Sequence, residues 1–124
     1  MEAACRGARS RRGRTIGILP GEDREEANGW VEIAIATGLG ELRNGLVVRA
    51  ADAVLCIGGS WGTLSEVALA VRTGVPVVAL GGWVLPRAEA PGPGIENAPD
   101  VEAAVRRVLE LAGSPRQRPE ICGP

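Results

Sequence analysis

Apolar and polar residues alternate in blocks along this chain, and the blocks predict strands that take turns with helices. Four short apolar runs each end at a polar residue or a turn that contains glycine, which is typical of strands in a buried sheet. These runs are residues 15–19, 31–36, 53–57 and 75–80. Alanine content or apolar residues at helical spacing predict helices between and around the runs. The predicted helices are residues 1–10, 41–51, 64–73 and 101–112.

The remaining segments are polar or rich in proline and glycine, and they predict connections. Residues 22–28 are a polar loop or a short helix, and residues 85–99 are a surface loop. Asp100 stands where it can N-cap the last helix. Residues 113–124 are polar, and we expect them to form a disordered tail.

The alternation of strands and helices predicts an α/β fold, a Rossmann-like three-layer sandwich with a mostly parallel sheet. At 124 residues the chain makes one domain at most, and we assign that domain to residues 1–112. In such a sheet the carboxyl ends of the strands lie along one edge, where ligands bind. The turns that follow the four predicted strands should therefore converge on one site.

Composition limits the chemistry that this site can use. The chain has no His, Phe or Tyr, all 14 of its cationic residues are Arg, and its net charge is −1. Histidine, the commonest general base and metal ligand, is therefore absent. With a net charge near zero, no overall electrostatic field draws the chain to nucleic acid or a membrane. Its three cysteines are far apart and predict neither a metal site nor a disulfide framework. No apolar run is long enough to cross a bilayer, so we expect a cytoplasmic protein without a membrane partner or a bound metal.

Two charged clusters have ordinary explanations. The arginines between Arg6 and Arg14 faintly resemble a transit peptide or a nucleic-acid patch, but no aromatic residue lies nearby to stack on bases. The carboxylates between Glu22 and Glu26 resemble a metal cluster only superficially. A solvated surface is the favoured interpretation of both, and nucleic-acid binding is unlikely.

The most informative stretch is the glycine-rich turn between the third predicted strand and the helix after it. Its residues are Gly58, Gly59, Ser60, Trp61, Gly62 and Thr63, followed by Leu64, Ser65 and Glu66. Such a turn aims backbone N–H groups and the positive end of a helix dipole at one point, where a phosphate commonly binds. Thr63 and Glu66 also fit a capping box, a purely structural role. Trp61 and Trp83 either stack on a flat ligand or cover the sheet edge.

A second candidate loop follows the second predicted strand. Thr37, Gly38 and Gly40 shape a turn, and Arg43 and Asn44 stand at the start of the next helix. The guanidinium fork of arginine suits a phosphate or a nucleotide base. A turn-only role for the first three residues is equally open, and an exposed arginine on a helix face is common.

The stretch from Gly59 to Glu66 resembles the PGGxGTxxE motif of the LOG family, whose members include cytokinin-activating phosphoribohydrolases. The likeness is closer to a sister group in the SMF/DprA–LOG superfamily, whose loop reads GGGxGTxxE and which includes molybdenum-cofactor carrier proteins. Residues 15–20 and 37–44 are also similar to conserved segments of these families. Gly58 stands where LOG proteins have proline, Ser60 where glycine is usual, and Asn44 where lysine is usual. Gly58 favours the sister group, and Asn44 weakens the interpretation as a hydrolase.

The resemblance implies three functions. The first is a carrier or sensor of a phosphate-bearing, nucleotide-like ligand, with the molybdenum cofactor as its possible cargo. The second is a phosphoribohydrolase that cleaves the N-glycosidic bond of nucleoside 5′-monophosphates, in which Arg43 and Glu66 would be catalytic. A distant third is binding of single-stranded DNA, as in DprA.

The resemblance also bears on the size of the protein. Family members form homo-oligomers, so we expect a dimer or a tetramer. They carry a βα unit and a further strand before the helix that matches residues 1–4, and these elements appear missing here. We therefore expect an incomplete N-terminus, and a version extended upstream that is more stable than this chain.

Overall fold

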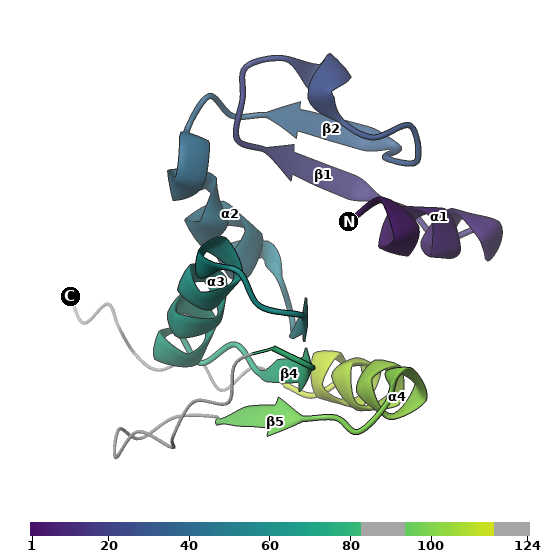
Figure 1. Cartoon of the computed structure of the whole chain (residues 1–124), viewed down its shortest axis with the longest axis vertical. Coiled ribbons are helices and arrows are strands. Elements are labelled where there is room, and N and C mark those ends of the chain that lie inside the picture. Colours follow the sequence, from purple (N-terminus) through teal and green to yellow (C-terminus); the bar gives the residue numbers. More distant parts are fainter. Residues whose placement is uncertain (83–93, 116–124) are drawn as a thin grey trace. The chain divides into compact units, whose positions relative to one another are not determined.

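The computed structural model describes residues 1–82 and 94–115. The chain divides into two compact units, residues 1–46 and 47–124, and each is described by itself. The first unit contains α1 (Glu2–Ser10), β1 (Ile16–Leu19), η1 (Arg24–Glu26), β2 (Ile33–Ala36), η2 (Gly40–Leu42) and the start of α2 (Arg43–Ala50). The second contains the rest of α2, then β3 (Val54–Ile57), α3 (Trp61–Arg72), β4 (Val77–Leu80), β5 (Ile95–Asn97) and α4 (Val101–Ala112). Figure 1 labels these elements along the chain.

In the first unit, β1 and β2 form a parallel pair, with Ile16 opposite Ile33 and Leu19 opposite Ala36. The strands predicted at these places are confirmed, but the expectation of a buried strand at residues 15–19 is wrong beyond Thr15, because residues 16–19 are exposed or only partly buried. Ile16 is 62% exposed, because the structure pairs β1 with β2 alone. This unit is stabilised at its surface by Glu32, whose carboxylate accepts hydrogen bonds from Arg9 and Arg14.

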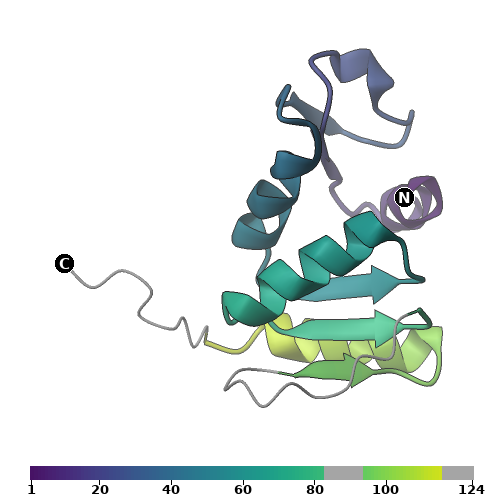
Figure 2. The same cartoon turned by 60° about the vertical axis from the view of Figure 1, so that its left-hand side comes forward.

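In the second unit, β3, β4 and β5 form a parallel sheet in that order. The views of Figures 1 and 2 place α3 on one face of this sheet and α4 on the other. These three layers, and the parallel sheet between them, confirm the predicted fold class. β4 is the central strand, and Val77, Val78 and Ala79 are all buried, as expected for a strand covered on both faces.

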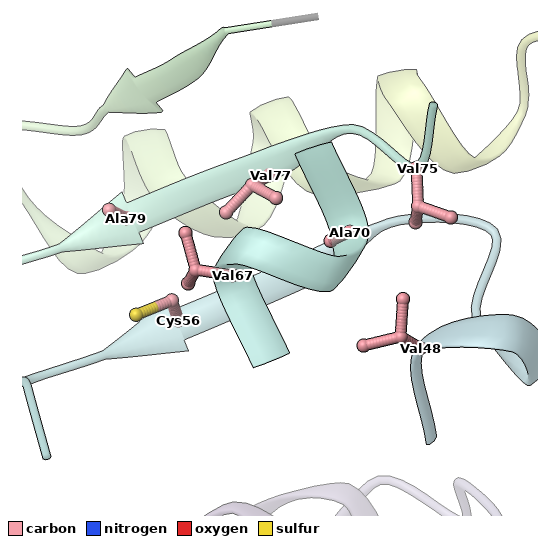
Figure 3. Packing of buried hydrophobic residues seen from close by; sticks show 7 residues of the cluster. All are labelled: Val48, Cys56, Val67, Ala70, Val75, Val77 and Ala79. Atoms are coloured by element: carbon pink, nitrogen blue, oxygen red, sulfur yellow. The ribbon is translucent and has the colours of Figure 1, made fainter. Parts of the chain in front are cut away.

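The apolar core of this unit lies between the sheet and α3. Figure 3 shows how its side chains, all of them aliphatic or a thiol, point toward one another. They are Val48, Cys56, Val67, Ala70, Val75, Val77 and Ala79. Because successive side chains of a strand alternate between faces, Val78 points to the opposite face, where α4 contributes the fully buried Ala104.

Two expectations about the end of the chain need correction. The segment 85–99 is not a loop throughout, because Ile95–Asn97 forms β5 and pairs in parallel with β4. The apolar stripe predicted on the last helix is only partly buried: Ala104 is 0% exposed, whereas Val101 is 63% exposed. The Asp100 N-cap is confirmed, since its carboxylate accepts a hydrogen bond from the Ala103 amide at 2.8 Å. Residues 83–93 and most of the predicted tail lie outside the described residues.

Candidate ligand-binding loops

The loop between β3 and α3 is shaped by glycine and held to the neighbouring strand. Gly58 has φ +69°, a conformation that other residues adopt at a cost. Its amide donates a hydrogen bond to the Leu80 carbonyl of β4 at 3.1 Å. The chain therefore turns sharply at the carboxyl end of β3, and the next residues, Gly59 and Ser60, are exposed there.

Ser60 is the N-cap of α3. Its hydroxyl accepts a hydrogen bond from the Thr63 amide at 3.2 Å and lies 3.0 Å from the Thr63 hydroxyl. The capping box predicted at Thr63 and Glu66 is therefore wrong in register, because the helix begins at Trp61, three residues before the predicted first residue. Ser60 occupies the N-cap position because a serine hydroxyl there accepts a hydrogen bond from an amide of the first helical turn.

The N-terminus of α3 has the features of an anion site. The helix is 12 residues long, so its first-turn amides and its dipole direct positive potential toward Gly59 and Ser60. Trp61, its first residue, is 77% exposed, so the indole covers little of the sheet edge. An exposed indole beside an anion site suits a planar ligand that carries a phosphate. Trp83, the other predicted stacking residue, lies outside the described residues.

Glu66 is half-buried on α3. Its negative charge acts on the thiol of Cys56, which lies in β3. Burial raises the pKa of the Cys56 thiol above its ordinary value, and the negative charge of Glu66 raises it further. The thiol is thus held in its protonated form, in which it can donate to the Gly58 carbonyl, 3.5 Å away. A role for the Glu66 carboxylate beside a bound phosphate stays a prediction from the sequence.

The loop after β4 contacts the loop between β3 and α3. Gly81 and Gly82 have φ values of +67° and +93°. A Cβ atom built on Gly82 would collide with the Gly58 carbonyl oxygen and lie 2.6 Å from the Gly58 carbonyl carbon. The predicted convergence of strand-end turns thus holds for β3 and β4. The sequence shows the Gly81–Gly82 pair but not which glycine makes the contact.

In the first unit, the loops after β1 and β2 are likewise joined at one edge. The Gly38 amide donates to the Gly21 carbonyl at 2.9 Å, and the Gly40 amide donates to the Pro20 carbonyl at 3.0 Å. The Thr37 hydroxyl donates to the Leu19 carbonyl at 2.6 Å. Thr37, Gly38 and Gly40 therefore act in the turn itself, one of the two roles predicted for them, and a ligand role remains a prediction.

Arg43 and Asn44 begin α2, as predicted. Arg43 is half-buried, and Asn44 is only 5% exposed. Both belong to the first compact unit, whereas Gly58 to Glu66 belong to the second. Their assignment to one site with Glu66 therefore stays a prediction from the sequence.

Within residues 1–82 and 94–115, no three His, Cys, Asp or Glu side chains gather as a metal site. None of the described helices is long and apolar enough to span a membrane.

Comparison with known proteins identifies relatives of this architecture. A family model described as the SLOG cluster4 family matches residues 1–108. An uncharacterized protein of Archaeoglobus fulgidus is 40% identical over 80 residues, which are 64% of this chain and 52% of that protein. The chain thus spans about half the length of this curated relative.

Two solved structures similar to this chain are those of molybdenum cofactor proteins. One is the molybdenum cofactor binding protein of the phototrophic bacterium Rippkaea orientalis, with 36% identity and a TM-score of 0.64 over 90% of this chain and 58% of that one. Another is the molybdenum cofactor carrier protein of Chlamydomonas reinhardtii, with 31% identity and a TM-score of 0.73 over 90% of this chain and 69% of that one. The superfamily and the Rossmann-like fold predicted from the sequence are confirmed.

Proposed function

We propose, from the premise that this chain belongs to the SLOG cluster4 family, that it binds a phosphate-bearing, nucleotide-like ligand at the loop after β3 and carries it without chemical change. The molybdenum cofactor is the cargo that we propose. The proposal rests above all on the N-terminus of α3, where Gly58 turns the chain and Ser60 caps the first turn. The names of the two molybdenum cofactor proteins support the choice of cargo.

Each part of the ligand has a counterpart in the loop. First-turn amides of α3 and the helix dipole would bind the phosphate. The exposed indole of Trp61 would stack on the pterin ring system or on a nucleotide base. Glu66 would lie beside the bound ligand, where its carboxylate can accept hydrogen bonds from ring N–H groups or sugar hydroxyls.

The proposed carrier function is tested by measuring cofactor binding and nucleotide turnover on the same preparation. The chain is incubated under anaerobic conditions with molybdenum cofactor released from a molybdenum enzyme, and molybdenum that co-elutes in size-exclusion chromatography is quantified. The same preparation is incubated with a panel of nucleoside 5′-monophosphates, and free base is measured. We expect co-elution of molybdenum and no release of base.

Ser60→Asp is the matched variant for this experiment. Aspartate caps a helix as well as serine does, so α3 keeps its cap while a negative charge enters the anion site. We expect Ser60→Asp to lose the cofactor at an unchanged melting temperature, and Ser60→Thr to retain it. Co-elution that Ser60→Asp does not reduce would place the cargo elsewhere on the chain.

The phosphoribohydrolase is the competing function, and Glu66 distinguishes it. In glycosidic cleavage a carboxylate stabilises the oxocarbenium-like sugar and orients water. Release of base by the wild-type chain, lost in Glu66→Gln, would establish the hydrolase and overturn the carrier. A wild-type chain that neither binds the cofactor nor releases base would reject both functions.

A further inference from the structure

The loop after β4 contacts the proposed binding loop by its backbone. Gly82 has φ +93°, and the space that its side chain would need is taken by the peptide that joins Gly58 to Gly59. A Cβ atom on Gly82 would lie 2.6 Å from the Gly58 carbonyl carbon and 3.2 Å from the Gly59 nitrogen. Both are backbone atoms, so no flexible side chain can move aside to make room. Gly81, the preceding residue, has nothing within 4 Å of the corresponding position.

The same peptide is held on its carbonyl side by a second group. The Cys56 thiol lies 3.5 Å from the Gly58 carbonyl oxygen and donates to it. The Gly58 oxygen therefore points toward Cys56, while the Cβ position of Gly82 lies over the face of the same peptide, close to its oxygen, carbon and nitrogen. In a trans peptide the N–H group points opposite to the carbonyl, and the chain has no cis peptide bond among its described residues. The Gly59 N–H group consequently points away from the Cys56 thiol, and Gly59 is an exposed residue of the loop.

We infer that Gly82 is a positioning residue for the anion site, because its lack of a side chain lets the Gly58–Gly59 peptide keep the orientation that aims the Gly59 N–H at a bound phosphate. The inference rests on the proposed function and extends the site to the loop after β4. Gly82 touches no ligand itself. It acts through the peptide plane, so its substitution turns a donor away from the site without removing any ligand-binding side chain.

Gly82→Ala and Gly81→Ala make a matched pair that tests the inference. Both place alanine at a positive φ, so both carry the backbone strain of that conformation. Only Gly82→Ala adds the collision with the Gly58–Gly59 peptide. Adenosine 5′-monophosphate is used as the probe, and its dissociation constant is measured for each variant by calorimetry. The position of the Gly59 amide signal is measured by ¹H–¹⁵N NMR without ligand, and the melting temperature by circular dichroism.

We expect Gly82→Ala to weaken binding at least tenfold and to move the Gly59 amide signal, whereas Gly81→Ala weakens binding less than threefold. We expect the melting temperature to fall further in Gly82→Ala, which carries the added collision, with both variants still folded at the temperature of the binding measurement. Unchanged binding in Gly82→Ala, or an equal loss in both variants, would overturn the inference. If the wild-type chain does not bind the probe, the proposed function fails for this ligand class. The Gly59 signal then decides the positioning role alone: movement in Gly82→Ala but not in Gly81→Ala supports it, and any other result rejects it.

Discussion

Ser60 is the residue on which the geometry of the candidate site depends most directly. Its hydroxyl accepts a hydrogen bond from the Thr63 amide and lies within hydrogen-bonding distance of the Thr63 hydroxyl. Removal of an N-cap side chain leaves a first-turn amide without its partner. We expect Ser60→Ala to lower the free energy of unfolding by about 1 kcal/mol, measured by urea denaturation. Ser60→Asp is the control, because it keeps a capping oxygen. Equal losses in the two variants would contradict the capping role.

Cys56 gives the chain an unusual dependence on alkaline pH. The chain has no Lys, His or Tyr, so cysteines and the terminal amine are the groups that titrate between about pH 7 and 11. Burial, and then the charge of Glu66, raises the pKa of Cys56 in the folded state. As pH rises, the unfolded thiol loses its proton first, so the folded state becomes relatively less stable. The stabilisation is therefore complete below the ordinary thiol pKa and is lost as pH rises toward the folded one.

Urea denaturation between pH 7 and 10, with reductant present, measures this effect. We expect the free energy of unfolding to decline with pH in the wild-type chain, and to decline less steeply in Cys56→Ala. Glu66→Gln should also flatten the curve, because the thiol pKa falls when the neighbouring negative charge is removed. A slope that is the same in all three proteins would show that Cys56 does not titrate as the structure indicates.

At the scale of elements, the link between β5 and α4 is a testable ion pair. The Arg107 guanidinium donates two hydrogen bonds to the Glu96 carboxylate, at 2.6 and 2.9 Å. These hydrogen bonds are the main reason that the pKa of Glu96 is lowered. Their contribution is present above the unfolded pKa of the carboxyl group and is lost as pH falls through the folded pKa.

We expect Glu96→Gln to reduce the free energy of unfolding at pH 7 by a few tenths to about 1 kcal/mol, because both side chains are partly exposed. The difference from the wild-type chain should shrink as pH falls through the lowered pKa of the folded carboxyl group, as measured by urea denaturation over a series from pH 7 downward. Glu110→Gln, which removes the i,i+3 pair with Arg107 and leaves the link to β5, should have a smaller effect. A difference that persists in acid would rule out the ion pair as its source.

Most elements could be predicted from the sequence because their local signals agree with their final environment. The run at 75–80 is apolar throughout and becomes the buried central strand β4. β5 could not be predicted, because Ile95–Asn97 has one apolar residue, and its strand conformation comes from pairing with β4. The contact of Gly82 with Gly58 is also invisible in sequence, since Gly81 and Gly82 differ only in their place in the folded loop. Ser60 was predicted as a ligand residue, but its capping role depends on where the helix begins.

For the whole molecule, the family resemblance predicts an oligomer, and the exposed apolar stripe of α4 is the surface where we expect copies of the chain to associate. Val101, Val105 and Leu109 recur at helical spacing and are 63%, 43% and 66% exposed. In an antiparallel pair of these helices centred on Val105, Val101 of one copy would meet Leu109 of the second. Glu102 of one copy would then lie within about one turn of Arg106 of the second, a favourable charge pairing. We therefore propose that the occupant of this stripe is a second copy of the chain.

Multi-angle light scattering coupled to size-exclusion chromatography tests the association. We expect the wild-type chain to elute as a dimer or a tetramer, and Leu109→Glu to shift it toward a smaller species. Leu42→Glu is the control, because Leu42 is 74% exposed in the other compact unit. An assembly that Leu109→Glu leaves intact would exclude α4 as the interface, and a monomeric wild-type chain would reject the oligomer.

The two compact units differ most in how their sheets are buried. The nine apolar residues that are buried within the described part of the chain all lie from Val48 onward, whereas in residues 1–46, all of which the structure describes, only Thr15 and Asn44 are buried. A two-stranded sheet without an apolar core is marginally stable, and local opening needs little free energy where apolar burial is low. We therefore predict that backbone amides of β1 and β2 exchange with solvent at least about tenfold faster than those of β4.

Hydrogen exchange followed by NMR compares amides in the two sheets within one sample, so pH and temperature are the same for both. The amides of β3 are the internal control, because this edge strand belongs to the well-buried unit, with Cys56 in its core. Slow exchange in β3 and β4 together with fast exchange in β1 and β2 would support separate stabilities. Equal protection would show that the first unit draws stability from contacts beyond its own residues.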